Sequence, residues 1–442
     1  MAGEIELLPT RTLTGIVGFD AAGLAGYASP LALATAAQIA RNDWQLATLG
    51  DSRVAMQFND SLYRSKSGYS ALNFVNSRNQ QLFSTVYYGG WSGDRTDQIN
   101  VRLPNAIAST AKVLYYLGGV NDIAQQYPSA SISGYISAAN KIYACNTAIA
   151  AGMTVILETE VGAENFTTAQ IEQMHVHNAI IRNYVQATTG VYLHDSTFAL
   201  ADNTVGTGVV RFKPGYFQEA LGSGVHAAAL GAYHWSKSLE NVFKAVFKPG
   251  YSDRPHASFI PAYGRWGLSP NPCFYGTAGT NGTGNTGTVP TGCTAANSGS
   301  TSTTSIGTLN GQNYVDVTIT FTAASQRFTL YSESANQNWA AGDTIYGYAK
   351  AELLSGTVAE CVCLYMENNF DGSTKLFTDG LSMLNKTGPN EAFSVDLRTI
   401  DWLIPALTTK GWLAPSVRVY STGAGTVNVR IWYMGVARRP PV

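Results

Sequence analysis

The side chains best suited to chemistry lie in four short segments. The first is Leu49-Gly50-Asp51-Ser52, which ends an apolar stretch. The others are Gly-Trp-Ser-Gly at 90–93, Gly-Gly-Val-Asn-Asp at 118–122 and Ser-Gly-Val-His at 223–226. A serine hydroxyl becomes a strong nucleophile when a histidine takes its proton, and attack on an ester carbonyl creates an oxyanion that needs fixed N–H donors. Together the segments hold a serine, a histidine and such donors, so they predict serine-based acyl transfer.

In residue type, order and spacing, these segments resemble the sequence blocks of the SGNH (GDSL-type) hydrolases, a family of esterases and lipases. The resemblance covers about residues 44–245. It implies that Ser52 is the nucleophile and His226 the base. It also implies that the oxyanion is bound by the backbone N–H groups of Ser52 and Gly93 and by the side-chain amide of Asn121. Taken singly, the glycines are also typical of turns, and Asn121-Asp122 of a helix cap.

The third position of the catalytic triad departs from the family pattern. The family usually has Asp three residues before the histidine, and here that residue is Ser223. A serine hydroxyl can fix the histidine tautomer, but a neutral group stabilises the imidazolium poorly. We therefore expect either a slower Ser-His dyad or an acid from elsewhere in the chain, with Asp195, Asp202 and Asp253 as candidates.

The composition favours an extracellular protein with much β structure. A net charge of -1 and 13% charged residues give no basic field, so a nucleic-acid partner is not expected. The 44 glycines and 24 tyrosines, with many Ser, Thr and Asn, support the β-rich class. No stretch predicts a membrane helix, because the apolar segment at 21–40 is interrupted by Gly, Ser and Pro. The N-terminus shows no signal peptide, and we expect an extracellular or virion-associated location.

Five cysteines do not form an even disulfide framework. Cys361 and Cys363 are two residues apart in a strand-like run and should fill one face of a core. Cys273 and Cys293 bracket a loop, and whether they pair is left open by the sequence.

The order of apolar runs predicts two domains. Residues 1–43 read as an N-terminal arm or attachment segment, and short apolar runs near 44–48, 111–117, 153–157 and 191–193 alternate with helical stretches at 132–151, 168–187 and 227–246. This alternation predicts a three-layer, flavodoxin-like parallel sheet over 44–266, with the Ser52 and Asn121 segments at the carboxyl ends of strands. Residues 267–304 are rich in Gly, Thr and Asn and predict a linker or loop. Alternating runs at 314–321 and 427–433 predict a jelly-roll-like β-sandwich over 305–442.

Other patterns are weaker. His175 and His177 are two apart on a predicted helix and so do not share a face, which disfavours a metal site. His256 lies in a literal D-x-x-H but lacks the helix pattern that follows His226. Glu158 and Glu160 follow a strand and could form a glycosidase-type pair only at a suitable separation. We expect neither a metal nor another cofactor.

The resemblance and the appended β domain lead us to expect a carbohydrate O-acetylesterase, working on a polysaccharide or another acylated substrate. A small-residue arm without an export signal suggests a phage tail spike acting on bacterial capsule or O-antigen, for which a homotrimer is one expected assembly. Two alternatives stay open: a lipid or small-ester hydrolase with a structural β domain, and a non-catalytic glycan-binding virion adhesin.

Overall fold

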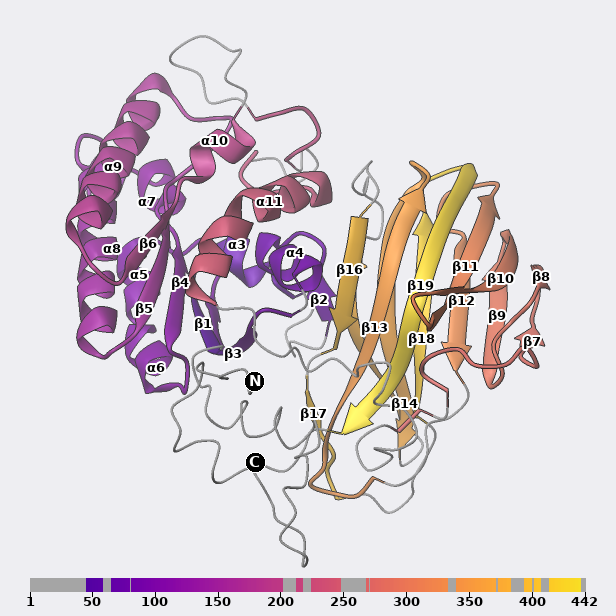
Figure 1. The fold of residues 1–442 in the computed structure, drawn as a ribbon. Coiled ribbons are helices and arrows are strands. Elements are labelled where there is room, and N and C mark those ends of the chain that lie inside the picture. The colour runs from indigo at the N-terminus through magenta and orange to yellow at the C-terminus, as the bar shows by residue number, and fades with distance from the viewer. Residues whose placement is uncertain are drawn as a thin grey trace, which may run out of the picture.

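The computed structural model describes residues 45–58, 65–79, 81–201, 212–217, 224–247, 268–269, 271–332, 339–370, 373–382, 393–399, 401–406 and 413–438. They form an α/β region followed along the chain by a β-rich region at its side (Figure 1). The predicted N-terminal arm, residues 1–43, lies outside the described residues.

The α/β region is built on a parallel sheet. Its strands are β1 (Gln45–Gly50), β3 (Ser84–Gly90), β4 (Val113–Leu117), β5 (Thr154–Glu158) and β6 (Val191–His194). Their spatial order, β3-β1-β4-β5-β6, is the 2-1-3-4-5 order of flavodoxin-like folds. The order reverses at β1 and β4, and ligands of such sheets bind beyond the carboxyl ends of the strands at this point. The segments that hold Ser52 and Asn121 follow these two strands.

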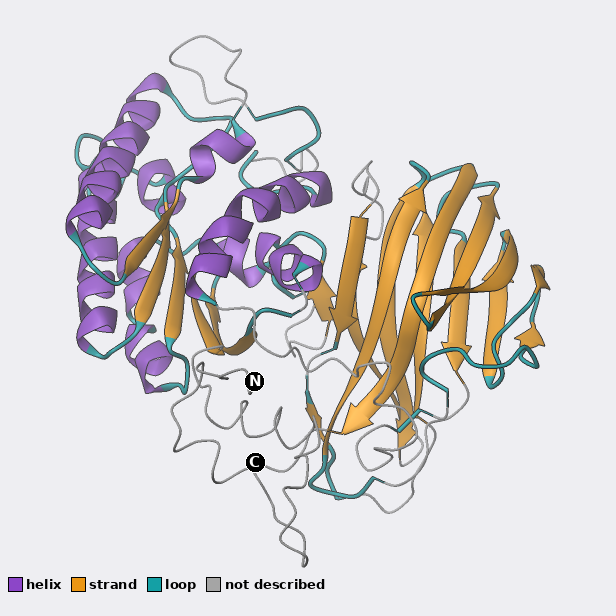
Figure 2. Ribbon diagram, viewed as in Figure 1, coloured by secondary structure: helices purple, strands orange, loops and turns teal. Residues whose placement is uncertain are grey.

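Helices cover both faces of the sheet (Figure 2), because neighbouring strand residues point to opposite sides. Leu46 and Tyr115 belong to one core cluster, whereas Ala47 and Tyr116 belong to the other. The first face is covered by α4 (Ala71–Arg78) and α11 (Ala229–Val246). The second is covered by α5 (Thr96–Asn100), α6 (Leu103–Ala108), α8 (Ser133–Ala150) and α9 (Thr168–Ala187). Short helices follow three strand ends: α3 (Ser52–Ala55), α7 (Val120–Ala124) and α10 (Ser196–Leu200).

Local chemistry explains the two long helices of the second face. A capping box starts α9, in which the Thr167 hydroxyl accepts from the Gln170 backbone and the Gln170 side chain accepts from Thr167 N–H. Gly134 lets α8 approach α9 closely, because a Cβ at this position would lie 1.9 Å from the carbonyl oxygen of Gln173. The helices predicted at 132–151 and 168–187 are confirmed to within two residues.

The β-rich region consists of two sheets in the described part of the chain. One has the order β16-β13-β19-β11-β10-β8 with β17 paired to β13, and the other has the order β2-β15-β14-β18-β12-β9-β7. The strands are β7 (Thr280–Asn281), β8 (Asn285–Gly287), β9 (Cys293–Ser298), β10 (Thr301–Leu309), β11 (Gln312–Phe321), β12 (Arg327–Ser332), β13 (Thr344–Ser355), β14 (Ala359–Phe370), β15 (Ser373–Ser382), β16 (Phe393–Arg398), β17 (Trp402–Leu403), β18 (Leu413–Ser421) and β19 (Gly425–Arg438). Buried Val, Ile, Leu and Phe side chains from both sheets share one core. This confirms a β-rich C-terminal region, while a jelly-roll connection stays a prediction.

The segment 267–304 is not the linker or loop that its composition predicted, since β7, β8, β9 and the start of β10 lie within it. The interpretation was wrong because polar side chains can be satisfied by one another inside a sheet. The buried Asn285 amide donates to Asn281 and Thr304, and its oxygen accepts from Ser302 at 2.5 Å. A segment poor in apolar residues therefore folds through side-chain hydrogen bonds.

Strand pairing and side-chain hydrogen bonds connect the α/β region to the β-rich region. Strand β2 (Ser65–Ser67), from the α/β half of the sequence, pairs in parallel with β15. Lys66 Nζ donates to the Arg398 carbonyl at 2.8 Å, and Gln81 Nε2 to the Asp396 carbonyl at 2.5 Å. The sequence analysis did not predict that residues before β3 would complete a sheet of the β-rich region.

Within the described residues, Cys273 and Cys293 are buried and are not joined by a disulfide. Burial raises the pKa of the Cys273 thiol to about 12. Cys363 is buried, as predicted for its face of the strand. Among the helices that the structure describes, none is both long and apolar enough to cross a bilayer.

Candidate active site

Ser52 is the first residue of α3 and sits directly beyond β1. The Asp51 side chain caps this short helix by accepting from Arg53 N–H at 2.9 Å. Gly50 lets the end of β1 approach β4 closely, since a Cβ there would lie 2.3 Å from the Leu117 carbonyl oxygen. Ser52 itself is 8% exposed, so it is largely buried at the carboxyl end of the sheet.

His226 faces Ser52 across the carboxyl edge of the sheet. Its Nε2 lies 2.8 Å from the Ser52 Oγ, although the two residues are 174 positions apart. The backbone directly after His226 is fixed, because Ala227 bridges to Phe217 and Ala228 N–H donates to the Tyr216 carbonyl at 2.7 Å. With Nδ1 protonated, Nε2 can accept the serine proton, so the predicted nucleophile and base are brought together.

Gly93 lies in the loop after β3 and adopts a φ of +83°. A Cβ there would meet no atom within 4 Å, so the backbone conformation and not local crowding explains the glycine. The Gly93 carbonyl accepts from Gln125 Nε2 at 3.0 Å, and the next carbonyl, that of Asp94, accepts from Asn121 Nδ2 at 2.9 Å. In the described part of the chain, the backbone N–H groups of Ser52 and Gly93 have no protein acceptor. They are suited to bind an oxyanion.

Asn121 is in the first turn of α7 and does not cap it. The N-cap is Gly119, and no side chain caps this helix. One N–H of the Asn121 amide holds the Asp94 carbonyl, and because an amide nitrogen carries two hydrogens, a second donor remains. The interpretation of Asn121-Asp122 as a cap of α7 is therefore wrong. The Asn121 amide, the predicted oxyanion donor, also fixes the conformation of the Gly93 loop through its hydrogen bond to Asp94.

A buried ion network beneath the nucleophile was missed by the sequence analysis. Arg53 contacts Asp51 through Nη2 at 2.6 Å and Glu160 through Nη1 at 2.8 Å, with side-chain exposures of 2%, 0% and 0%. Burial lowers the pKa of the Arg53 guanidinium, but the two carboxylates outweigh it and the pKa ends well above its ordinary value. Gly119 packs on this network, since a Cβ there would be 3.1 Å from Glu160 Cγ. The sequence offers only a weak signal for this network, an arginine that directly follows the Gly50-Asp51-Ser52 segment.

Two further residues position the Gly93 loop. Arg102 bonds Asp94 through Nη1 at 2.5 Å and donates to the carbonyls of Gly89 and Gly50 at 3.1 and 3.2 Å. Asp122 accepts from the backbone N–H and the hydroxyl of Thr96 at 2.9 and 2.7 Å. Burial raises the pKa of Asp122 to about 6, although these hydrogen bonds favour its charged form.

The group that orients His226 is not identified by the described residues. Ser223, Asp202 and Asp253 lie outside them, as does His256. Asp195 is described, and it serves another network: its oxygens accept from Thr159 Oγ1 at 3.1 Å and Arg182 Nε at 2.7 Å. Burial opposes ionisation of Asp195, but these partners dominate and lower its pKa.

The weaker candidates are placed in structural roles. Glu158 is fully buried and accepts from Tyr115 and Trp235, and Glu160 is held by Arg53, so the two do not form a carboxylate pair in a cleft. His175 is exposed while His177 is buried on the other side of α9. Burial, with the nearby Lys141, lowers the pKa of His177 well below its ordinary value. The described residues hold no group of three or more potential metal ligands.

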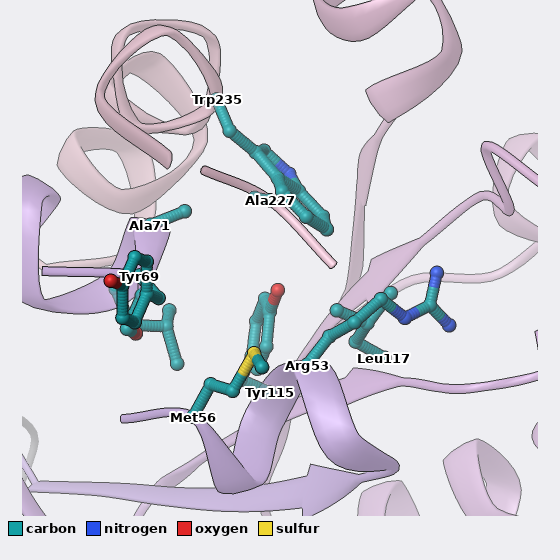
Figure 3. A pocket seen from close by; sticks show the side chains of 10 residues that line it. Arg53, Met56, Tyr69, Ala71, Tyr115, Leu117, Ala227 and Trp235 are labelled. Atoms are coloured by element: carbon teal, nitrogen blue, oxygen red, sulfur yellow. The ribbon is translucent and has the colours of Figure 1, made fainter. Parts of the chain in front are cut away.

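A small recess is lined in part by residues that are next in sequence to Ser52 and His226 (Figure 3). Its walls include Arg53 and Ala227, the neighbours of the two catalytic candidates, together with Met56, Leu72 and Trp235. The Arg53 guanidinium points away from it. Its closed part has room for little more than one small group.

Comparisons with known proteins give structural likenesses only. No protein-family model and no curated protein matches the chain. A GDSL-like lipase from Bacteroides thetaiotaomicron is 16% identical, with 47% of this chain and 88% of that chain covered and a TM-score of 0.35. A catalytic mutant of an acetylxylan esterase from Geobacillus stearothermophilus is 15% identical, with coverages of 45% and 93% and a TM-score of 0.35. A structure of carbohydrate-binding modules of the β-sandwich superfamily is 12% identical, with coverages of 33% and 56% and a TM-score of 0.25. Likenesses at this level do not transfer a function to this chain.

Proposed function

We propose that this protein is a serine ester hydrolase that removes acetyl groups from a carbohydrate. The observation that carries the proposal is the 2.8 Å contact between Ser52 Oγ and His226 Nε2 at the carboxyl end of β1, beside two backbone N–H groups that have no acceptor among the described residues.

The residues are arranged for a two-step reaction. Ser52 Oγ attacks the ester carbonyl while His226 Nε2 takes its proton, and the oxyanion accepts from the N–H groups of Ser52 and Gly93 and from the Asn121 amide. His226 then protonates the leaving alcohol, which leaves the acyl group on Ser52. Water repeats the sequence with His226 as base, releasing the carboxylic acid and restoring the serine.

The acetyl part of the proposal is supported by the size of the recess. We assign the acyl group to this recess, which is bounded by Met56 and Leu72 and is small enough to favour an acetyl group over a longer chain. The carbohydrate part is supported by the exposed, ring-bearing and polar surface around the Gly93 loop. Lipid substrates favour a wide apolar entrance instead.

Replacing the nucleophile tests the reaction. Ser52→Ala should lower kcat for p-nitrophenyl acetate by about a million-fold, as in other serine hydrolases, with an unchanged melting temperature. The matched control is Ser305→Ala, which alters an exposed serine of β10 in the β-rich region and should keep wild-type rates. Wild-type-like turnover by the Ser52 variant would refute the proposal.

Acyl-length preference tests the acetyl part. The wild-type protein should prefer acetate to butyrate and octanoate esters, and Met56→Ala should raise the butyrate-to-acetate ratio of kcat/KM by about 10-fold, the effect of one or two methylenes in an apolar pocket. A wild-type preference for octanoate would favour a lipid hydrolase instead.

A further inference from the structure

We propose that Trp91 and Tyr127 form an aromatic rim that binds the sugar ring of the substrate beside the oxyanion donors. This inference rests on the proposed function, because it assigns the alcohol side of the same site. Trp91 lies on the loop that follows β3, and Tyr127 lies on the loop that follows α7. In the hydrogen-bonding network of these loops, Gly93 lies between the two residues.

Trp91 is 60% exposed, which is unusual for so large an apolar side chain. It is nevertheless close to the nucleophile, because its backbone N–H donates to the Gly50 carbonyl at 3.1 Å and Ser52 is two residues further on. Gly93, which carries an oxyanion donor, is two residues after Trp91. The Trp91 backbone is therefore tied to the segment that carries the nucleophile, and we place its ring at the mouth of the catalytic site.

The Trp91 ring has a rigid support. The Arg102 guanidinium lies 5.6 Å from the centre of the ring, and the same guanidinium is fixed by Asp94 and two strand-end carbonyls. A cation bound to a ring face orients the ring and leaves the opposite face for a ligand. Little conformational freedom is then lost when a ligand binds, which favours affinity.

Tyr127 repeats this arrangement on the neighbouring loop. It is 38% exposed, and the Arg95 guanidinium lies 4.0 Å from its ring centre. Arg95 donates to Gln125 at 3.1 Å, and Gln125 in turn donates to the Gly93 carbonyl at 3.0 Å. The second ring is thus connected to the oxyanion loop through a short hydrogen-bonded chain.

The surroundings of the rings favour a sugar over an acyl chain. Each ring has a guanidinium over one face, and these guanidinium groups bind polar partners, Asp94 for Arg102 and Gln125 for Arg95. A pyranose presents C–H groups to an aromatic face and hydroxyls at its edge to such polar groups, whereas an alkyl chain would leave them unpaired.

The test compares two acetate esters that differ in the alcohol. One is ethyl acetate, which has no ring, and the other is fully acetylated methyl glucoside, with released acetic acid followed in a pH-stat. Trp91→Ala should lower kcat/KM for the glucoside about 10- to 100-fold, the range for loss of one aromatic stacking partner, mainly through KM. Its rate on ethyl acetate should stay within about twofold, and Trp91→Phe should restore most of the glucoside activity.

Tyr143→Ala is the matched control, because it removes an equally exposed ring (63%) from α8, outside the rim. Calorimetric titration of the acetylated glucoside into Ser52→Ala, with and without Trp91→Ala, gives a readout that needs no turnover. An equal loss on both esters, or unchanged glucoside activity and binding, would overturn the rim while leaving the esterase intact. A wild-type protein that hydrolyses neither ester would overturn the proposed function, and the rim with it.

Discussion

The α/β region and the β-rich region bury polar groups in different ways. Beneath Ser52, the charged side chains of Arg53, Asp51 and Glu160 are almost completely buried. In the β-rich region the Arg430–Asp316 pair keeps exposures of 21% and 34%, and a buried polar cluster such as that around Asn285 is uncharged. Buried ion pairs cost much desolvation energy, so they are poor devices for stability alone. Here their benefit is geometric, since they fix the turn that presents the nucleophile.

The largest effect should come from breaking the buried network. Arg53→Met leaves two buried carboxylates without their partner, and we expect a loss of about 3–5 kcal/mol in the free energy of unfolding, together with loss of esterase activity. The equivalent change in the other region, Arg430→Met, should cost at most about 1 kcal/mol, because that pair is partly solvated. Urea unfolding of both variants measures the difference, and equal losses would remove the contrast between the regions.

The intermediate effect distinguishes the Asn121 side-chain amide, which is proposed to bind the oxyanion, from the Asn285 side-chain amide, which stabilises the fold. Asn121→Ala should lower kcat about 100- to 1,000-fold with little change in KM, because an oxyanion donor is lost. Asn285→Ala should leave kcat unchanged but cost about 1–3 kcal/mol of stability, since Ser302 and Thr304 lose a buried partner. The kcat and the melting temperature of both variants test whether each amide acts in catalysis or in stability. A kcat loss from Asn285→Ala alone would reverse the assignment.

The smallest effect is a pH dependence of stability. Folding raises the pKa of Asp122 to about 6, so the native state binds this proton more tightly than the unfolded chain does. Protonation of Asp122 therefore stabilises the native state, and this stabilisation is lost as the pH rises through about 6. Between about pH 4 and pH 7 the unfolding free energy of the wild type should fall by about 1–3 kcal/mol more than that of Asp122→Asn.

Parallel curves for the wild type and Asp122→Asn would show that Asp122 does not titrate with the fold.

Much of the α/β region could be predicted because its signals are local. The fully buried run of β4 and the amphipathic pattern of α9 are readable within a window of a few residues. The β-rich region was harder, since the pairing of β7, β8 and β9 depends on hydrogen bonds among Asn, Ser and Thr that only form between strands. Composition alone made this segment resemble a linker.

The sequence by itself determined the catalytic candidates Ser52, Gly93, Asn121 and His226, through the resemblance of their segments to the SGNH hydrolases. The alternation of strands and helices further predicted that the Ser52 and Asn121 segments lie at the carboxyl ends of strands. Only the tertiary structure decided what holds them there. The contact from Ser52 to His226 spans 174 positions and that from Arg53 to Glu160 spans 107. Contacts of this length leave no local periodicity in the chain, and a buried arginine differs from an exposed one only through its surroundings.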